Sequence, residues 1–392
     1  MDRIRELATE CGLAVAGVTT ADPFPGLAEQ LDQRVADGHL AGMDWFTPER
    51  SIVSANPRML HDGARSIIAV GIPYFRSDIQ APNDGILRGR IARYAWGRDY
   101  HVTLKKRMEA LRVLLMAEYG REINARLLVD TARIVDRAVS ARAGVGWYGK
   151  HTNLIVPGHG SFVMLGELLV DLELPSSEPI NKNCGACTIC MHRCPTNAIV
   201  QPYVVDAPRC ISFQTIEQRG VIPEHLRGKM ENWVFGCDLC QDVCPYTGAA
   251  RSMIDEAFAP AAIENAFPPL GWLLEMSEET FRSTYRGTAV LRTKRAGLAR
   301  NAAIALGNTG SPDELPILAR TMAQHDLWLV RAHAAWAIGA IGGDRGQDIL
   351  RQALTHEVNE IVIHECQMAL AGMNEVRDEQ KPNLNSTSGI TN

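Results

Sequence analysis

Eight of the ten cysteines fall between positions 184 and 244, and their spacing is that of iron–sulfur ligands. The first block holds three cysteines two residues apart and a fourth before a proline. The second block, at 237–245, is shorter by one cysteine but also ends in Cys-Pro. Two-residue gaps let one turn aim successive thiolates at a single cluster, whereas the cysteine before proline ligates the other cluster. The predicted chemistry is electron transfer through two 4Fe-4S clusters.

Crossed ligation divides these thiols into two sets of four. The first set is Cys184, Cys187, Cys190 and Cys244. The second set is Cys194, Cys210, Cys237 and Cys240. In the second set Cys210 substitutes for the cysteine that the shorter block lacks.

Zinc and disulfides are the competing interpretations of the same cysteines. Paired Cys-x2-Cys knuckles bind structural zinc, but a third cysteine at the same spacing followed by Cys-Pro is typical of clusters. Disulfides would require an oxidising compartment, and the sequence shows no signal-peptide pattern. Cys11 and Cys366 lie in apolar helical surroundings and are expected in the core.

The composition is that of a globular protein with more than one core. The chain has 392 residues, of which 46% are hydrophobic and 22% are charged, and that length predicts two or three cores. No apolar run approaches the roughly 18 residues that cross a bilayer, so we expect a cytoplasmic protein without membrane contact. A net charge of -5 disfavours wholesale coating of nucleic acid but permits a local basic patch. Nothing in the sequence demands more than a monomer.

Residues 1–175 are expected to form a mixed α/β domain. Two segments have helical periodicity and three are apolar runs rich in β-branched residues. The helices are expected at 4–11 and 100–119, and the strands at 66–72, 126–129 and 162–170. Asp130 follows the second strand, and a carboxylate at a strand end is a common catalytic location, although turns also favour Asp there.

The segment 144–151, Gly-Val-Gly-Trp-Tyr-Gly-Lys-His, matches two nucleotide-binding patterns. A dinucleotide site requires a preceding strand, but 136–143 is polar and helical. A P-loop requires a Ser or Thr hydroxyl where His151 stands. We therefore expect these glycines to let the backbone approach a large cofactor, with Lys150 supplying a charge.

The remainder of the chain divides into three parts. A linker at 174–179 leads into a ferredoxin-like domain at 176–255, and a helical domain follows at 256–376. In the helical domain Ala-Ala-Ile-Ala-Leu-Gly at 302–307 recurs 32 positions later, and a weaker copy follows at 366–370. Small residues at such a period indicate stacked helix pairs of the HEAT type. The polar tail at 377–392 is expected to be disordered.

A basic patch lies at the start of the repeats. The segment 282–300 holds several arginines and one lysine but no acidic residue. A solvated helix face is the ordinary explanation of such a run. The alternative is a concave solenoid surface that binds the phosphates of a nucleic acid.

Several motifs closely resemble the epoxyqueuosine reductase family. The resemblance covers about residues 3–375. The motifs are Arg-Tyr-Ala-Trp-Gly-Arg-Asp-Tyr-His at 93–101, Val-Asp-Thr at 129–131, Asp-Arg-Ala at 136–138, Ala-Gly-Val-Gly-Trp-Tyr-Gly-Lys at 143–150, Leu-Gly-Glu-Leu at 165–168, the eight-cysteine block, and Arg-Cys-Ile-Ser-Phe at 209–213.

This resemblance implies an α+β multidomain enzyme with a cobalamin-binding α/β domain, two 4Fe-4S clusters and HEAT-like repeats. The implied reaction, the last step of queuosine synthesis, reduces the epoxide of epoxyqueuosine to an alkene at the wobble nucleotide of tRNA. It takes two electrons, supplied by an external donor, and two protons. Asp130 matches the family's proton donor in the Val-Asp-Thr motif, and a protonated carboxyl would need a raised pKa, which burial against the corrin could give.

The resemblance also implies binding residues. The implied cobalamin contacts are Arg50, Leu154, Leu165, Ser212 and Asp238, several through backbone atoms. The implied tRNA contacts are Arg292, Arg295, Arg300 and Asn301. Some relatives carry a cysteine near the cobalt where this chain has Ala92, so we do not expect an essential catalytic cysteine there.

Two other functions fit part of the sequence. Reductive dehalogenases also join cobalamin to two ferredoxin-like clusters, but they are typically exported and have no need of a basic helical-repeat domain. A non-enzymatic electron-transfer protein would leave the first 175 residues without a role. Cobalamin binding would separate that last possibility from both enzymes.

Overall fold

The computed structural model describes residues 2–248, 250 and 255–379. Its N-terminal part is built on a four-stranded sheet with the order β1-β2-β7-β4, in which all neighbouring strands are antiparallel. The strands are β1 (Val15–Thr20), β2 (Ser66–Pro73), β7 (Val163–Val170) and β4 (Ala125–Leu128). The three strands expected from the sequence are confirmed, because their apolar residues are buried in the sheet.

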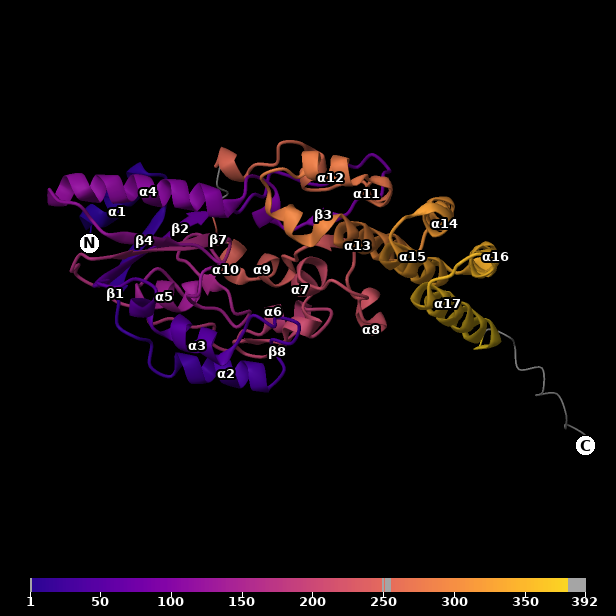
Figure 1. Ribbon diagram of the computed structural model, residues 1–392, viewed down its shortest axis with the longest axis horizontal. Helices are drawn as coiled ribbons and strands as arrows, with labels where there is room; N and C mark the ends of the chain where they lie inside the picture. The colour runs from indigo at the N-terminus through magenta and orange to yellow at the C-terminus, as the bar shows by residue number, and fades with distance from the viewer. Residues whose placement is uncertain (1, 249, 251–254, 380–392) are drawn as a thin grey trace, which may run out of the picture.

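Helices cover both faces of this sheet (Figure 1). The helices α1 (Asp2–Glu10) and α4 (Tyr100–Tyr119) pack on one face, and both were expected from periodicity. The helices α3 (Pro48–Ala55) and α5 (Asp136–Arg142) pack on the other face, next to α2 (Leu27–Ala36). The result is a three-layer arrangement whose loops after β4 and before α4 face the rest of the chain.

The cluster region consists of short elements. They are β5 (Trp147–Tyr148), β6 (Leu154–Ile155), α6 (Ile189–Arg193), β8 (Ile199–Gln201), β9 (Val204–Val205), α7 (Ile211–Ile216), α8 (Glu224–Arg227), β10 (Trp233–Phe235), α9 (Leu239–Asp242) and α10 (Pro245–Gly248). Strand β10 pairs in parallel with β3 (Arg90–Ile91), which precedes α4 in the chain. This pairing attaches the cluster region to the N-terminal part.

The C-terminal helices form an arm that extends away from the sheet (Figure 1). They are α11 (Leu270–Glu275), α12 (Glu278–Thr284), α13 (Lys294–Thr309), α14 (Leu315–Gln324), α15 (Trp328–Ile341), α16 (Gly343–Leu354) and α17 (Glu360–Glu379). The three sequence repeats lie on α13, α15 and α17, which pack in succession. The glycines of the repeat permit close contact, because a Cβ on Gly307 would stand 2.8 Å from the Ala337 backbone. The helical repeat is therefore confirmed.

Short 3-10 helices complete the chain. They are η1 (Pro57–Met59), η2 (Arg93–Ala95), η3 (Ala207–Arg209), η4 (Glu256–Phe258), η5 (Ile263–Asn265), η6 (Ala289–Thr293) and η7 (Pro312–Glu314). Among the described residues, no helix is both long enough and apolar enough to span a bilayer.

One apolar core crosses two of the expected domain boundaries. It joins Trp96 of the first part, Phe235 of the cluster region and Leu298 of α13. The helical arm thus shares a hydrophobic core with the N-terminal part and the cluster region, and is not joined to them by a linker alone. Helix α17 runs to Glu379, so the tail expected from 377 begins inside a helix, and residues 380–392 lie outside the described part of the chain.

Candidate active site

The four thiols of the first predicted cluster set lie together. Burial raises the pKa of Cys190, and Cys184, Cys244 and Cys187 raise it further because each would add negative charge nearby. Cys190 and Cys244 are buried, whereas Cys184 and Cys187 are half-buried. This set therefore has two thiols inside the fold and two nearer the surface.

The four thiols of the second predicted set also lie together. Burial raises the pKa of Cys240, followed by the effects of Cys237, Cys210, Cys194 and Cys190. The first three of these neighbours belong to the same set, and Cys190 belongs to the other. The thiols that act on one another thus follow the two predicted sets, and the sets lie next to each other, although no three of the described Cys, His, Asp or Glu residues are arranged to hold a metal ion.

A chamber adjoins the second group. Three adjoining cavities of about 730, 440 and 280 Å³ share Tyr94, Tyr100 and Asp130 as lining residues. All four thiols of the second group line the 440 Å³ cavity, and Ala92 lies beside them. A typical small-molecule pocket measures roughly 300–1,000 Å³, so the joined chamber has room for a cofactor and for part of a substrate.

The five residues implied as cobalamin contacts all line this chamber. Arg50 lines its largest part, Leu154 and Leu165 line the smallest, and Ser212 and Asp238 line the part beside the thiols. The Asp238 carboxylate is already paired with Arg93 at 3.0 Å and is almost fully buried. A contact from Asp238 to a cofactor would therefore use its backbone.

His151 offers the chamber a free hydrogen-bond donor. Its Nδ1 accepts a hydrogen bond from the Asn153 backbone N–H, so Nε2 carries the proton of the neutral ring. Nε2 is buried without a partner among the described residues, and burial lowers the pKa of His151 to about 4. A buried unpaired donor is costly, so this wall suits a polar group of a bound cofactor.

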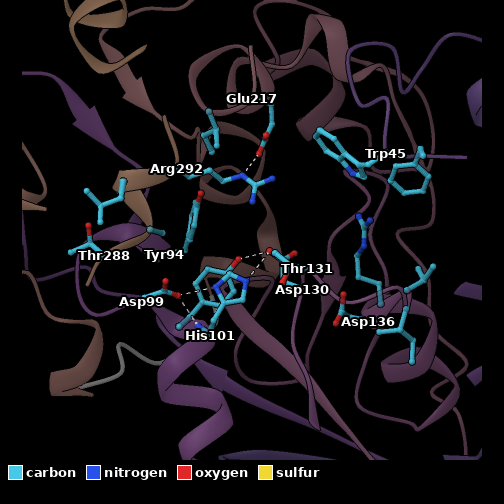
Figure 2. Close-up of a pocket in the computed structure, with 18 of the residues that line it drawn as sticks. Trp45, Tyr94, Asp99, His101, Asp130, Thr131, Asp136, Glu217, Thr288 and Arg292 are labelled. Carbon is cyan, nitrogen blue, oxygen red and sulfur yellow. Dashed lines mark hydrogen bonds and ion pairs between the residues drawn. The ribbon is translucent and has the colours of Figure 1, made fainter. Parts of the chain in front are cut away.

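Asp130 stands at the junction of the chamber (Figure 2). It follows β4 with a positive φ of 43°, a left-handed conformation that Asp tolerates better than most residues. The Tyr100 hydroxyl donates a hydrogen bond to its carboxylate at 2.5 Å, and His101 Nε2 lies 3.6 Å from the same oxygen. On the other side of the ring, His101 Nδ1 lies 2.8 Å from Asp99.

The protein neighbours of Asp130 lower its pKa, and a raised pKa on burial against a corrin stays a prediction. Burial raises that pKa, but the nearby His101, the hydrogen bond from Tyr100 and the charge of Arg292 together outweigh burial, so the pKa is lowered. The ion-pair contact with Asp130, followed by the hydrogen bond with Asp99, raises the pKa of His101 to about 9. At neutral pH the proton of this group of residues therefore resides on His101.

The prediction that Arg300 and Asn301 contact nucleic acid is wrong. Both side chains are completely buried. The Arg300 guanidinium donates to the backbone carbonyls of Gln214, Gln218 and Gly220 at 2.7 to 2.8 Å. Asn301 donates to backbone carbonyls in the same region. These residues fasten α13 to the end of α7.

The other predicted basic contacts are partly neutralised. Arg292 lines the largest cavity, is about half-exposed and pairs with Glu217. Arg295 is largely buried and pairs with Asp326. Arg286 and Lys294 are exposed, and neither has an ion pair within the described part of the chain. The basic run is therefore less positive than the sequence suggested, because acidic residues from other segments of the chain pair with two of its arginines.

The glycine-rich segment approaches protein rather than a cofactor. A Cβ on Gly144 would stand 2.3 Å from the Glu178 carbonyl, and one on Gly146 would stand 2.4 Å from the Ile155 carbonyl. Lys150 donates to the Gly185 carbonyl at 2.7 Å. Tight packing on protein backbone therefore accounts for Gly144 and Gly146, and the approach of this segment to a cofactor stays a prediction.

Sequence reasoning missed His101, Tyr100 and Trp45. The first two belong to the segment 93–101 that carried the family resemblance, but they were assigned only to a surface helix. Trp45 is 43% exposed and lines the largest cavity opposite Arg292 (Figure 2). An isolated aromatic residue in a loop carries no signal of its own, so only the fold reveals it.

Two groups of four thiols, one of them beside a chamber that holds a protonated imidazole and a carboxylate, define an iron–sulfur oxidoreductase. Residues 183–247 match a 4Fe-4S double cluster binding domain, residues 55–131 match epoxyqueuosine reductase QueG, DUF1730, and residues 288–371 match HEAT repeats.

An epoxyqueuosine reductase of Bacillus anthracis is 35% identical over 361 residues, which are 92% of this chain and 93% of the relative. The chain belongs to the epoxyqueuosine reductase family.

Solved structures agree with this membership. One is an epoxyqueuosine reductase with a tRNA-Tyr epoxyqueuosine-modified tRNA stem loop, at a TM-score of 0.87 and 32% identity. Another is the Bacillus subtilis enzyme with its catalytic aspartate loop swung out of the active site, at a TM-score of 0.86 and 31% identity. Each comparison covers 95% of this chain and 98% of the other.

Proposed function

We propose that this protein reduces the epoxide of epoxyqueuosine to the alkene of queuosine at the wobble nucleotide of tRNA. Family membership supports this substrate, as does the relative solved with an epoxyqueuosine-modified stem loop. The observation that carries the proposal is the chamber itself, because the second group of thiols lines one side and Asp130 lies at its junction. One cavity thus joins a source of electrons to a source of protons.

Electrons from an external donor would enter through the first cluster. Its ligands would be Cys184, Cys187, Cys190 and Cys244, none of which lines the cavity beside the second set. The second cluster would be held by Cys194, Cys210, Cys237 and Cys240, which line the chamber. Clusters pass electrons one at a time, and bound cobalamin would collect two of them for the reduction.

The chain's own residues would hold this cofactor against the second cluster. Leu154 and Leu165 would supply apolar contact, Arg50 a positive charge, and Ser212 a polar contact close to Cys210. The Asp238 backbone would contribute next to Cys237. The unpaired His151 Nε2 would donate to one of the polar side groups of the corrin.

The substrate would enter through the largest cavity. Trp45 is placed to stack on an unpaired base, an interaction worth about 1–3 kcal/mol per base. Arg292, about half-exposed, would contact an RNA phosphate, with Arg286 and Lys294 nearby along the chain. Arg295 would add to the local field while remaining paired to Asp326.

Asp130 and His101 would deliver a proton as one unit. Cleavage of the epoxide C–O bond leaves a strongly basic oxygen, which must be protonated to leave as water. Asp130 would contact this oxygen, while His101 holds the proton at neutral pH and Tyr100 orients the carboxylate. Groups this close titrate together rather than singly.

Anaerobic purification with iron and cobalt analysis, followed by turnover of epoxyqueuosine-containing tRNA, tests the proposal. About eight iron atoms and about one cobalt per chain are expected, from four irons in each cluster. The product tRNA should contain queuosine, and its formation should require both metals. A protein that binds no cobalamin, or that carries both cofactors without reducing the epoxide, would contradict the proposal.

A further inference from the structure

Glu167 is a buried carboxyl that the chemistry above does not use. It lies in the middle of β7, opposite Ala69 of β2 and Leu128 of β4, and its side chain has no exposed surface. Neither of its carboxylate oxygens accepts a hydrogen bond from a donor among the described residues. A buried carboxylate without a partner is strongly unfavourable, so such a group is protonated instead.

The neighbour of Glu167 is a second carboxyl, Asp136. Asp136 opens α5, which packs on the same face of the sheet, and its Oδ1 is likewise buried without a donor. Helix α5 packs on β7, and the two carboxyls are close enough that each acts on the pKa of the other. Two facing carboxyl groups can hydrogen-bond only if one of them carries a proton. Unlike Glu167, Asp136 lines the chamber beside Asp130 (Figure 2). The pair therefore connects the interior of the sheet to the reaction site.

The surroundings favour one retained proton. Burial raises the pKa of Glu167 well above its ordinary value, and the charges of Asp136 and Asp130 raise it further. Burial also raises the pKa of Asp136, which the nearby Arg137 opposes. The cross-strand neighbours on β2 and β4 are apolar, and Ser140 on α5 is uncharged. Arg137 is thus the cation that acts on the pair within the described residues.

We propose that Glu167 and Asp136 share one proton and supply it, through Asp136, as the second proton of the reduction. This inference rests on the proposed function. The epoxide, two electrons and two protons give an alkene and water. The Asp130–His101 unit gives one proton to the departing oxygen and Asp136 gives the other, which leaves two adjacent carboxylates. Two like charges at such a distance are unfavourable, so the pair regains a proton from solvent through the chamber before the next turnover.

Glu167 does not reach the chamber, so it acts by holding the proton that Asp136 passes on. The variant Glu167→Gln keeps the side-chain shape but has no acid proton, and Asp136→Asn keeps the acid on Glu167 but blocks its exit. Glu173→Gln is the matched control, because Glu173 lies just beyond the same strand and its side chain is 85% exposed.

The experiment measures two quantities on the intact protein with both clusters and cobalamin. The first is the infrared carbonyl band of a protonated carboxylic acid at pH 8, which should be present in the parent and in Asp136→Asn but lost in Glu167→Gln. The second is the rate of epoxide reduction, which should fall by roughly 10²-fold in both variants, the lower limit typical of a lost general acid. The control should match the parent in both measurements.

The two measurements distinguish failure of the shared-proton inference from failure of the proposed function. If the acid band persists in Glu167→Gln, or if either variant reduces the epoxide as fast as the control, the shared-proton inference is wrong. If the parent shows the band but does not reduce epoxyqueuosine at all, the proposed function fails while the shared proton stands. Should Glu167→Gln not fold, the rate of Asp136→Asn decides, because that substitution lies at the chamber surface.

Discussion

The proton on His101 can be tested by changing the residue that holds it. In Asp99→Asn the imidazole loses the negative charge that lies 2.8 Å from Nδ1 but keeps Asp130 at 3.6 Å. The change is conservative for folding, because the Asp99 side chain also caps α4 by accepting from the His101 backbone N–H, and Asn caps helices equally well. We therefore expect an altered pKa of His101 on an unaltered fold.

The magnitude follows from the pKa of His101, which is about 9 in the protein and 6.5 in an unperturbed histidine. At pH 7.5 a group with the higher value is roughly 97% protonated and one with the ordinary value roughly 9%. Asp130 remains in the variant, so the loss of rate at pH 7.5 should lie between onefold and about tenfold. At pH 5.5 both proteins hold the proton, and their rates should converge.

The assay is epoxide reduction between pH 5.5 and 10 with excess reductant and reconstituted cofactors. The alkaline limb of the parent should lie near pH 9, and that of Asp99→Asn should lie closer to neutral pH. Glu109→Gln removes a half-exposed carboxylate from the same helix and should leave the profile unchanged. If the profile of Asp99→Asn superimposes on that of the parent, the proton held by His101 is not the one used in the reaction. Because its folded pKa is raised, His101 stabilises the fold below pH 6.5, and this contribution is lost as the pH rises through about 9.

Four further substitutions test other residues of the site and of the helical arm. Asp130→Ala should lower turnover by roughly 10²-fold or more while iron and cobalt contents stay unchanged; full activity would remove Asp130 from the mechanism. Cys210→Ser should reduce iron from about eight to about four atoms per chain, whereas an unchanged iron content would exclude Cys210 as a ligand. Arg292→Glu should weaken tRNA binding and lower the slope of log affinity against log salt by about 0.7–0.9. Arg300→Ala should instead destabilise the fold by about 3 kcal/mol or more, because three backbone carbonyls lose their donor in a buried site. Weakened tRNA binding with unchanged stability in Arg300→Ala would restore the original interpretation of that residue.

The sequence predicted the parts of the fold that depend on local patterns. The cysteine spacing separated two groups of thiols, and the apolar run at 66–72 is a strand with both faces buried. The alanine and glycine repeat predicted stacked helices, because small residues at that period permit close packing. These features need only the order of residues in one segment.

The features that failed depend on partners far away in the chain. In the sequence, Arg300 has the features of an exposed cation. Only the fold shows that the backbone carbonyls of Gln214 and Gln218 accept its hydrogen bonds in the interior. The raised pKa of His101 was not predicted either, because the two carboxylates that raise it, Asp130 and Asp99, come from the loop after β4 and from the residue before α4. Sequence reasoning did not single out Glu167, because this residue lies within an otherwise apolar strand.

The fastening of α13 to α7 has a consequence for how the molecule responds to force. Helix α7 begins directly after Cys210, and its last carbonyls bind Arg300 and Asn301. A force applied to the arm would therefore be transmitted to α7, which begins directly after a predicted cluster ligand. The arm and the second cluster should move as one rigid body, which keeps the separation between docked RNA and electron source constant.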